Sequence, residues 1–189
     1  MTQKKIKTST LTHNLQCHLA FVGMMGSGKS TIGRMIAKHL QLPFYDIDKQ
    51  IEQNEESTIS NIFLNHGETY FRQIEAQTVM DVIALRAHVI SLGGGAFETP
   101  QTRKILKKHA ITIWLNVPFE VLWKRVSKKQ HRPLLQVSDP KTKLHALFKQ
   151  RLANYQKADI HFSTFESSKK ICCQKILQTV ETYLQQNKR

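Results

Sequence analysis

The sequence predicts an α/β protein in which a parallel sheet of about five strands lies between two layers of helices. Two observations lead to this prediction. Short apolar runs rich in branched and aromatic residues recur along the chain, and helical patterns separate them, as in βαβ units. The chain has 189 residues, of which 40% are hydrophobic, so it can bury the core of one domain. The predicted strands are residues 19–22, 44–47, 88–92, 111–115 and 160–163.

The helices between the runs carry recognisable end signals. Thr99 and Pro100 are typical of an N-cap and a first-turn proline, and they predict a helix over residues 101–109. Pro118 predicts the start of the next helix. Between residues 67 and 86, apolar side chains recur at helical spacing, so an amphipathic helix there would pack on the sheet. Its apolar face comprises Phe71, Ile74, Thr78 and Val82.

A glycine-rich segment directly follows the first apolar run. Residues 23–31 read GMMGSGKST and match the pattern G-x-x-x-x-G-K-[ST] between a predicted strand and a predicted helix. In that context backbone N–H groups surround phosphate oxygens, the lysine reaches the β- and γ-phosphates, and the serine hydroxyl can bind Mg²⁺. The segment therefore predicts a three-layer αβα P-loop fold that binds a nucleoside triphosphate. The predicted nucleotide-binding residues are Gly26, Ser27, Gly28, Lys29, Ser30 and Thr31, with Ser30 also binding the metal.

The chain divides into a basic tail and one domain. Residues 1–17 contain no arginine and lead into no signal-peptide core, so we expect a flexible tail, followed by a single domain over residues 18–189. Residues 128–140 hold two prolines and no regular period, and they form either a mobile lid or an ordinary surface loop. No apolar run approaches the ~18 residues of a membrane span, and the three cysteines lack C-x-x-C spacing. We therefore expect a cytoplasmic protein.

Six motifs in a fixed order make the sequence more specific than the P-loop alone. They are GMMGSGKSTIGR (23–34), FYDID (44–48), GETYFRQIE (67–75), SLGGGA (91–96), HRPLL (131–135) and KQRLANY (149–155). Together they resemble the shikimate kinases, small relatives of the nucleoside monophosphate kinases, over about residues 18 to 185. The resemblance implies an enzyme that transfers the γ-phosphoryl group of ATP to the 3-hydroxyl of shikimate, a step toward chorismate and the aromatic amino acids. It also implies Mg²⁺ as cofactor, and we expect a monomer without nucleic-acid or membrane partners.

Asp46 and Asp48 end the second apolar run, at the edge where open α/β sheets bind ligands. On an extended chain, the spacing of two residues puts both carboxylates on one side. The resemblance implies that Asp46 holds waters on Mg²⁺ and that Asp48 contacts the substrate hydroxyls and orients the attacking one. Asp48 would then be catalytic together with Lys29; a helix N-cap is the alternative role for Asp48.

Arg72 and Glu75 are three residues apart and so share one face of a helix. A surface ion pair worth ~0.2–0.5 kcal/mol is one interpretation. The resemblance implies another, in which Glu75 fixes the guanidinium of Arg72 and its planar fork binds the substrate carboxylate. Arg151, in KQRLANY, resembles the second arginine that binds this carboxylate.

Two further motifs are assigned by resemblance. Three glycines at 93–95 form either a tight turn or a close backbone approach to a ligand, and Gly94 matches the substrate-contacting position. Ser91 stands where a hydroxyl would contact a water on Mg²⁺. Arg132, in the suspected lid, would bind the nucleotide and act catalytically by bringing a cation to the γ-phosphate. Arg125 would lie along the adenine.

Two rival functions remain open at this stage. A different small P-loop kinase, for gluconate or a nucleoside monophosphate, would share the first motif but not the whole set. A nucleic-acid binder would use the net charge of +14, which comes from 28 Lys and Arg against 14 Asp and Glu. However, Trp114 and Trp123 fall in predicted strand and helix contexts rather than on a basic face, and no nucleic-acid-binding motif occurs.

Overall fold

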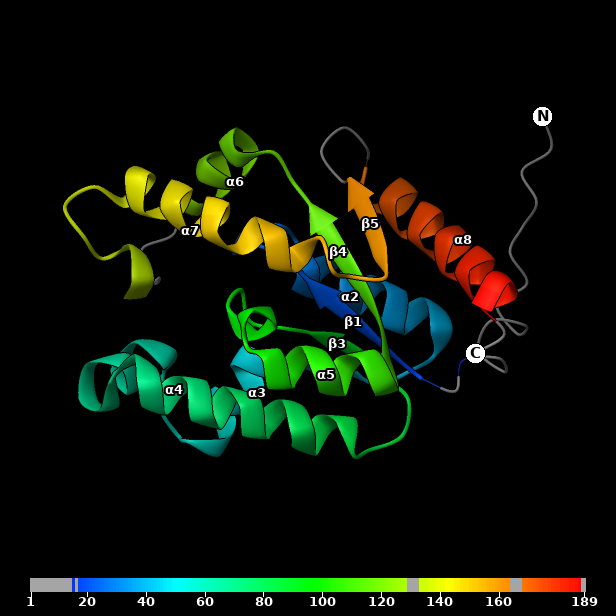
Figure 1. The fold of residues 1–189 in the computed structure, drawn as a ribbon, viewed down its shortest axis with the longest axis horizontal. Coiled ribbons are helices and arrows are strands. Elements are labelled where there is room, and N and C mark those ends of the chain that lie inside the picture. Colours follow the sequence, from blue (N-terminus) through cyan, green and yellow to red (C-terminus); the bar gives the residue numbers. More distant parts are fainter. Residues whose placement is uncertain (1–14, 16, 129–132, 164–167, 188–189) are drawn as a thin grey trace.

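A five-stranded parallel sheet forms the centre of the fold in the computed structural model (Figure 1). The structure describes residue 15 and residues 17–128, 133–163 and 168–187. The strand order is β2-β3-β1-β4-β5, so the chain moves to one side of β1 and then to the other. The strands are β1 (His18–Val22), β2 (Phe44–Asp46), β3 (Val89–Ser91), β4 (Ala110–Asn116) and β5 (Ile160–Ser163). The predicted strands and their parallel arrangement are therefore confirmed.

Helices cover both faces of the sheet, which gives three layers. Alternate residues of β1 belong to two separate cores: Leu19 and Phe21 pack with α2 (Lys29–Leu40) and α8 (Lys169–Asn187), while Ala20 and Val22 pack with helices of the opposite layer. This alternation follows from the period of two along a strand that is buried on both faces. The helices of the opposite layer include α4 (Ile59–Ile83), α5 (Pro100–His109) and α7 (Pro140–Tyr155).

The shorter helices lie near the carboxyl ends of the strands. The helix α3 (Ile47–Asn54) follows β2 directly, and α6 (Phe119–Val126) follows β4 and packs over the glycine-rich segment. Two short 3₁₀ turns, η1 (Ala96–Glu98) and η2 (Pro133–Leu135), lie beside α7. Because the loops after β1, β2 and β3 all leave this edge, their polar residues converge there.

Two details differ from the sequence-based expectations. The helix expected over 67–86 begins earlier, at Ile59, where the Thr58 hydroxyl accepts a hydrogen bond from the Asn61 N–H. Gly67 interrupts it with φ 79° and ψ 176°, so α4 consists of two helical segments joined at a kink. Thr99 does stand at the N-cap of α5, with Pro100 in the first turn, but its side chain makes no capping hydrogen bond.

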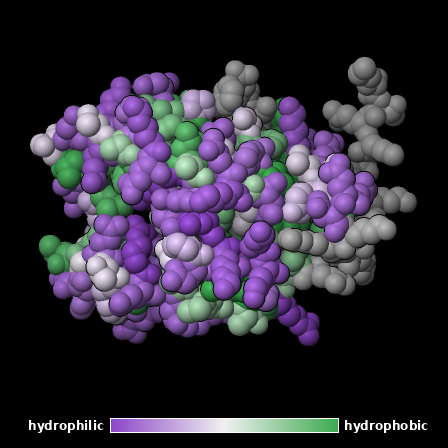
Figure 2. All heavy atoms as spheres, viewed as in Figure 1, coloured by the Kyte–Doolittle hydropathy of each residue, from purple (hydrophilic) through white to green (hydrophobic). Residues whose placement is uncertain are grey.

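The surface in Figure 2 is mostly hydrophilic. It is hollowed on the left of the view, between α4 and α7, which are labelled in Figure 1. Within the described residues, no helix is long and apolar enough to cross a membrane.

Candidate active site

The glycine-rich segment forms a loop between β1 and α2. Gly23, Gly26 and Gly28 all have positive φ, at 136°, 80° and 99°, which residues with a Cβ rarely adopt. At Gly26 a Cβ would also lie only 2.7 Å from Val126 Cγ2, so the loop can pass beneath α6 only without a side chain there. The sequence therefore folds here into a loop whose backbone is open to a ligand on one side.

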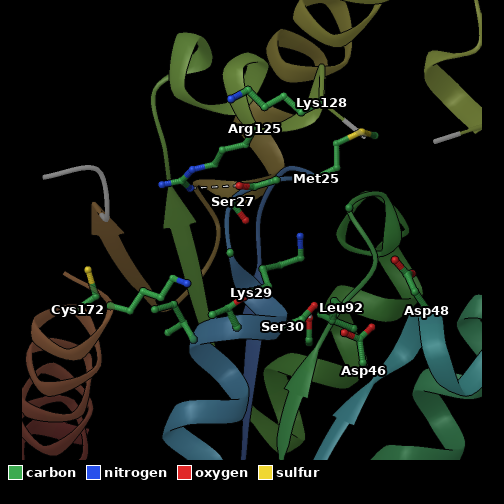
Figure 3. Close-up of a pocket in the computed structure, with 17 residues that line it drawn as sticks. Met25, Ser27, Lys29, Ser30, Asp46, Asp48, Leu92, Arg125, Lys128 and Cys172 are labelled. Atoms are coloured by element: carbon green, nitrogen blue, oxygen red, sulfur yellow. Dashed lines mark hydrogen bonds between the residues drawn. The ribbon is translucent and has the colours of Figure 1, made fainter. Parts of the chain in front are cut away.

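The polar side chains of this loop point into its hollow (Figure 3). The Lys29 ammonium donates hydrogen bonds to the carbonyl oxygens of Gly23 at 2.8 Å and Met24 at 3.0 Å. Ser27 is buried, and its hydroxyl has no hydrogen-bond partner within the described residues. A buried donor of this kind fits a phosphate oxygen as its partner.

Two further oxygen-bearing side chains lie near Ser30, the predicted metal ligand. The Ser30 hydroxyl lies 3.2 Å from the hydroxyl of Ser91, at the end of β3. The side chain of Asp46 lines the same cavity (Figure 3). These groups are oxygen donors, the type that Mg²⁺ prefers, and Mg²⁺ binds few protein ligands and keeps several waters.

A cavity of about 610 Å³ extends from the loop toward α6 and α8. Arg125 lies above the loop, where its Nη1 donates to the Gly26 carbonyl at 3.2 Å (Figure 3). Cys172 of α8 lines the opposite wall. The predicted nucleotide-binding residues Gly26, Ser27, Gly28, Lys29, Ser30 and Thr31 all line this cavity.

The spacing of Asp46 and Asp48 predicted that both lie on one extended segment, but the structure places them in different elements. Asp46 ends β2, and Ile47 already begins α3, so Asp48 lies in the first helical turn. Asp46 occupies the N-cap position of α3 but makes no side-chain capping bond. The side chains of both aspartates nevertheless line the cavity, because α3 starts at the carboxyl edge of the sheet.

A second cavity, of about 850 Å³, opens beside the first, between α3, α4 and α7. Arg72 and Arg151 reach it from two different helices, and Phe63 and Phe71 add apolar surface. It is contiguous with the first cavity, because both are lined by Met25, Ser30, Asp46, Asp48 and Gly94.

Arg72 is held in place by two carboxylates. Its Nη1 donates to Glu75 Oε2 at 2.7 Å, and its Nε and Nη2 donate to Glu68 Oε1 at 3.3 and 2.9 Å. The pair with Glu75 is not a surface ion pair, because Glu75 is only 2% exposed. The Glu68 contact was not anticipated, although its spacing of four residues from Arg72 could have predicted it.

Burial dominates the ionisation of Glu75. It raises the pKa of the carboxyl, the nearby Asp48 carboxylate raises it further, and Arg72 opposes both. The Glu75 Oε1 atom has no hydrogen-bond partner within the described residues. It faces Gly93, in the loop of three glycines at residues 93–95, called the glycine loop below. Two carboxylates and two arginines thus share a small volume.

The three glycines after β3 allow this crowding. A Cβ at Gly93 would lie 2.7 Å from Asp48 Oδ1 and even closer to Glu75 Oε1. A Cβ at Gly95 would lie 2.5 Å from Arg72 Nη1. All three glycines have negative φ, so the sequence needs glycine here for space rather than for a special turn.

Arg151 reaches the glycine loop from α7. It is 4% exposed, and its Nη1 donates to the Gly94 carbonyl at 3.0 Å. Arg132 lies outside the described residues, as does part of the suspected lid. Of that lid, Pro133 and Leu134 line the second cavity, next to Arg72 and Arg151.

Comparison with known proteins identifies this arrangement. The family model for shikimate kinase matches residues 25–181. The chain belongs to the shikimate kinase family. The shikimate kinase of Bartonella henselae is 38% identical over 184 residues, which cover 97% of this chain and 88% of the relative. That of Rhizobium meliloti is 39% identical over 163 residues, or 86% of this chain and 85% of the relative. As a shikimate kinase family member, the protein is an ATP-dependent kinase.

Solved structures agree with this family assignment. A shikimate kinase from Acinetobacter baumannii in complex with shikimate matches with a TM-score of 0.87 and 34% identity, covering 93% of this chain and 97% of that chain. A gluconokinase from Sinorhizobium meliloti matches with a TM-score of 0.52 and 14% identity, over 89% of this chain and 98% of that one. That likeness shows a shared fold alone. The family match thus favours shikimate kinase over the rival gluconate kinase.

Proposed function

We propose that this protein transfers the γ-phosphoryl group of ATP to the 3-hydroxyl of shikimate, giving shikimate 3-phosphate and ADP. One observation carries the proposal. The cavity at the glycine-rich segment of residues 23–31, the phosphate loop, meets at Asp48 and Gly94 the cavity that holds two arginines. A phosphoryl group can therefore pass between two bound substrates without crossing solvent. The shikimate bound in the Acinetobacter baumannii relative supports the choice of acceptor.

The acceptor cavity suits a small hydroxylated carboxylate. Arg72 and Arg151 would bind the carboxylate, because guanidinium groups offer paired N–H donors to its two oxygens. Three of the five N–H groups of Arg72 bond to Glu68 and Glu75, so two remain for a ligand. Asp48 would accept a hydrogen bond from the hydroxyl that attacks.

The nucleotide cavity supplies positive charge for the transferred group. Lys29 would turn from its loop carbonyls to the β- and γ-phosphates, and the loop N–H groups would hold the phosphate oxygens. Ser30 would bind Mg²⁺, with Asp46 and Ser91 contacting its waters. When bound, Mg²⁺ would neutralise part of the charge on the β- and γ-phosphates.

In the reaction, the 3-hydroxyl oxygen forms a bond to the γ-phosphorus, and the bond from that phosphorus to the bridging oxygen of ADP breaks. Asp48 orients the hydroxyl and receives its proton as the new bond forms. Because this transfer depends mostly on positioning and charge neutralisation, alignment by Asp48 contributes more than its basicity. We assign Arg132 to the γ-phosphate as the remaining cation.

A coupled assay of ADP release, run with shikimate, gluconate and nucleoside monophosphates in parallel, tests the acceptor. We expect turnover with shikimate and none above background with the others. Lack of turnover with shikimate would refute the proposed reaction. Mass spectrometry of the product should show one added phosphate group on shikimate.

We also propose that the enzyme works as a monomer in the cytoplasm. All residues proposed for the site belong to one chain, so no partner subunit has to complete it. No disulfide joins the described cysteines Cys17, Cys172 and Cys173, which fits a reducing compartment. Analytical ultracentrifugation with and without ATP tests the monomer, and a stable dimer would contradict it.

A further inference from the structure

A buried hydroxyl group that bonds to Gly94, the residue lining both cavities, has no part in the reaction described so far. Tyr155, the last residue of α7, is 1% exposed, and its hydroxyl donates a hydrogen bond to the Gly94 carbonyl oxygen. A buried hydroxyl lowers stability unless it is bonded, whereas a phenylalanine would fill the same space without that penalty. Packing alone therefore does not explain a tyrosine at this position.

Tyr155 contacts several parts of the site at once. Its ring stacks on Trp114 of β4, with centroids 6.1 Å apart and planes inclined by 22°. Its hydroxyl oxygen lies 3.7 Å from the Met24 sulfur in the phosphate loop. Arg151, one helical turn earlier, donates to the same Gly94 carbonyl at 3.0 Å. One face of α7 thus supplies two donors to a single carbonyl oxygen.

Two donors occupy both lone pairs of the Gly94 carbonyl and so fix its direction. Since the peptide group is planar and trans, its N–H, on Gly95, then points away from α7. Glycine has the widest backbone freedom of any residue, so without these bonds the loop would sample other peptide orientations. The bond from Arg151 also holds its guanidinium against the loop, and the Tyr155 bond fixes the carbonyl to which that guanidinium is attached.

We propose that Tyr155 is a positioning residue for the acceptor: its hydroxyl holds the Gly94 peptide against α7 and keeps Gly94 and Arg151 in their binding geometry. The inference rests on the function proposed above, since it concerns the acceptor cavity of that reaction. Tyr155 acts through Gly94 and Arg151 rather than on the reacting atoms. It therefore affects acceptor binding more than turnover or nucleotide binding.

The hydroxyl is suited to a constant structural task. Burial raises the pKa of Tyr155, so the group stays protonated and remains a donor throughout the physiological range. Its contribution to acceptor binding should accordingly not vary with pH.

The test compares Tyr155→Phe with Tyr183→Phe. Tyr155→Phe keeps the ring on Trp114 and removes only the hydroxyl, so the variant should fold. Tyr183→Phe is the matched control, because its hydroxyl bonds to Asp159 Oδ1 at 3.0 Å, among residues that line neither cavity. For Tyr155→Phe we expect a shikimate KM raised roughly fivefold to thirtyfold, as for loss of one buried hydrogen bond. Its kcat should stay within about threefold, and its ATP KM within about twofold, of the wild type.

The control should leave all three constants unchanged. A Tyr155→Phe enzyme whose shikimate KM is within about twofold of the wild type overturns the inference. So does a parallel change in kcat and both KM values, which a merely structural role would produce. If Tyr155→Phe does not fold, calorimetric shikimate binding by Tyr155→Met, also without the hydroxyl, decides: weakened binding supports the inference and normal binding overturns it. A wild type inactive on shikimate would instead refute the proposed function, and this inference with it.

Discussion

Asp48 is the residue on which the proposed transfer depends most directly. Its carboxylate lines both cavities, so in the proposed reaction it would reach both the acceptor and the transferred group. An amide of the same size would keep the shape of the site but could not take the hydroxyl proton.

We expect Asp48→Asn to lower kcat by about 100-fold or more, because the amide replaces the carboxylate that both aligns the attacking hydroxyl and takes its proton. ATP affinity should stay within about threefold of the wild type, since the phosphate loop is unchanged. Steady-state kinetics and nucleotide binding by calorimetry measure the two effects. Asp81→Asn, on the exposed side of α4 beside Gln77, is the control. Near-normal turnover by Asp48→Asn would contradict the assigned role.

Arg72→Lys tests the proposed binding of the acceptor carboxylate by Arg72. A lysine keeps the positive charge but loses the planar fork that bonds to Glu68 and Glu75 and leaves donors for a ligand. We expect the shikimate KM to rise about tenfold or more with a smaller change in kcat, because ground-state binding is lost. Arg86→Lys, at an exposed position, should behave as the wild type. An unchanged KM for Arg72→Lys would show that the acceptor binds elsewhere.

At the scale of elements, α4 brings the acceptor site together through its kink. The first segment of α4 contributes Ile59, Asn61 and Phe63 to the cavity, and the second contributes Arg72 and Glu75. Gly67 joins them in a conformation that is essentially restricted to glycine, with φ 79° and ψ 176°. A single straight helix would present these side chains on other faces.

Gly67→Ala should therefore lower the free energy of unfolding by about 1–3 kcal/mol, the typical strain of a residue with a Cβ in this region. The cause is backbone conformation alone, because beyond the adjoining backbone of its own helix a Cβ at Gly67 would meet nothing within 4 Å. Urea unfolding, compared with Asn65→Ala in the exposed helical turn before it, measures the effect. Equal stability of the two variants would mean that the kink tolerates other residues.

The elements also show how far the sequence alone could lead. Periodicity predicted the strands, because each is a short apolar run buried on the sheet. It could not predict that α3 begins immediately after Asp46, since Ile47 suits a strand and a helix equally. The sequence pattern predicts a helix only from Gly67 onward, whereas the structure has helix on both sides of this residue. Tyr155 ends the motif KQRLANY, but its contact with Gly94 joins residues 61 positions apart, which no local pattern reveals.

For the whole molecule, the buried His18, which packs against His88 at the opposite edge of the sheet, should make stability depend on pH. His18 accepts a hydrogen bond at Nδ1 from the His88 N–H at 3.3 Å, and Nε2 lies 3.1 Å from the Ile83 carbonyl. Both bonds require the neutral ring with its proton on Nε2. The His88 ring stands edge-on to it, 5.0 Å away, and also packs on Tyr45. Burial lowers the pKa of His18 below 6.5, as do His88 and His109, whereas the Ile83 bond opposes them.

Because the unfolded chain binds this proton more readily than the folded one, stability should fall as pH drops below about 6.5. We expect the free energy of unfolding of the wild type to decrease between about pH 7.5 and 5.5, with His18 contributing at most about 1.4 kcal/mol per pH unit. His18→Gln should flatten this slope, while His39→Gln, at an exposed position of α2, should not. Urea unfolding at several pH values measures the slopes, and equal slopes for wild type and His18→Gln would exclude His18 as the cause.

The glycine loop at 93–95 has a consequence for inhibitor design. Any side chain added at Gly93 or Gly95 would strike Asp48, Glu75 or Arg72, the groups on which the proposed reaction depends. An inhibitor that takes its affinity from the backbone of this loop would therefore meet a surface that a point mutation cannot reshape without disabling the enzyme. A mutation in this loop that weakened such an inhibitor would also impair the proposed reaction. Resistance would therefore have to arise elsewhere in the molecule.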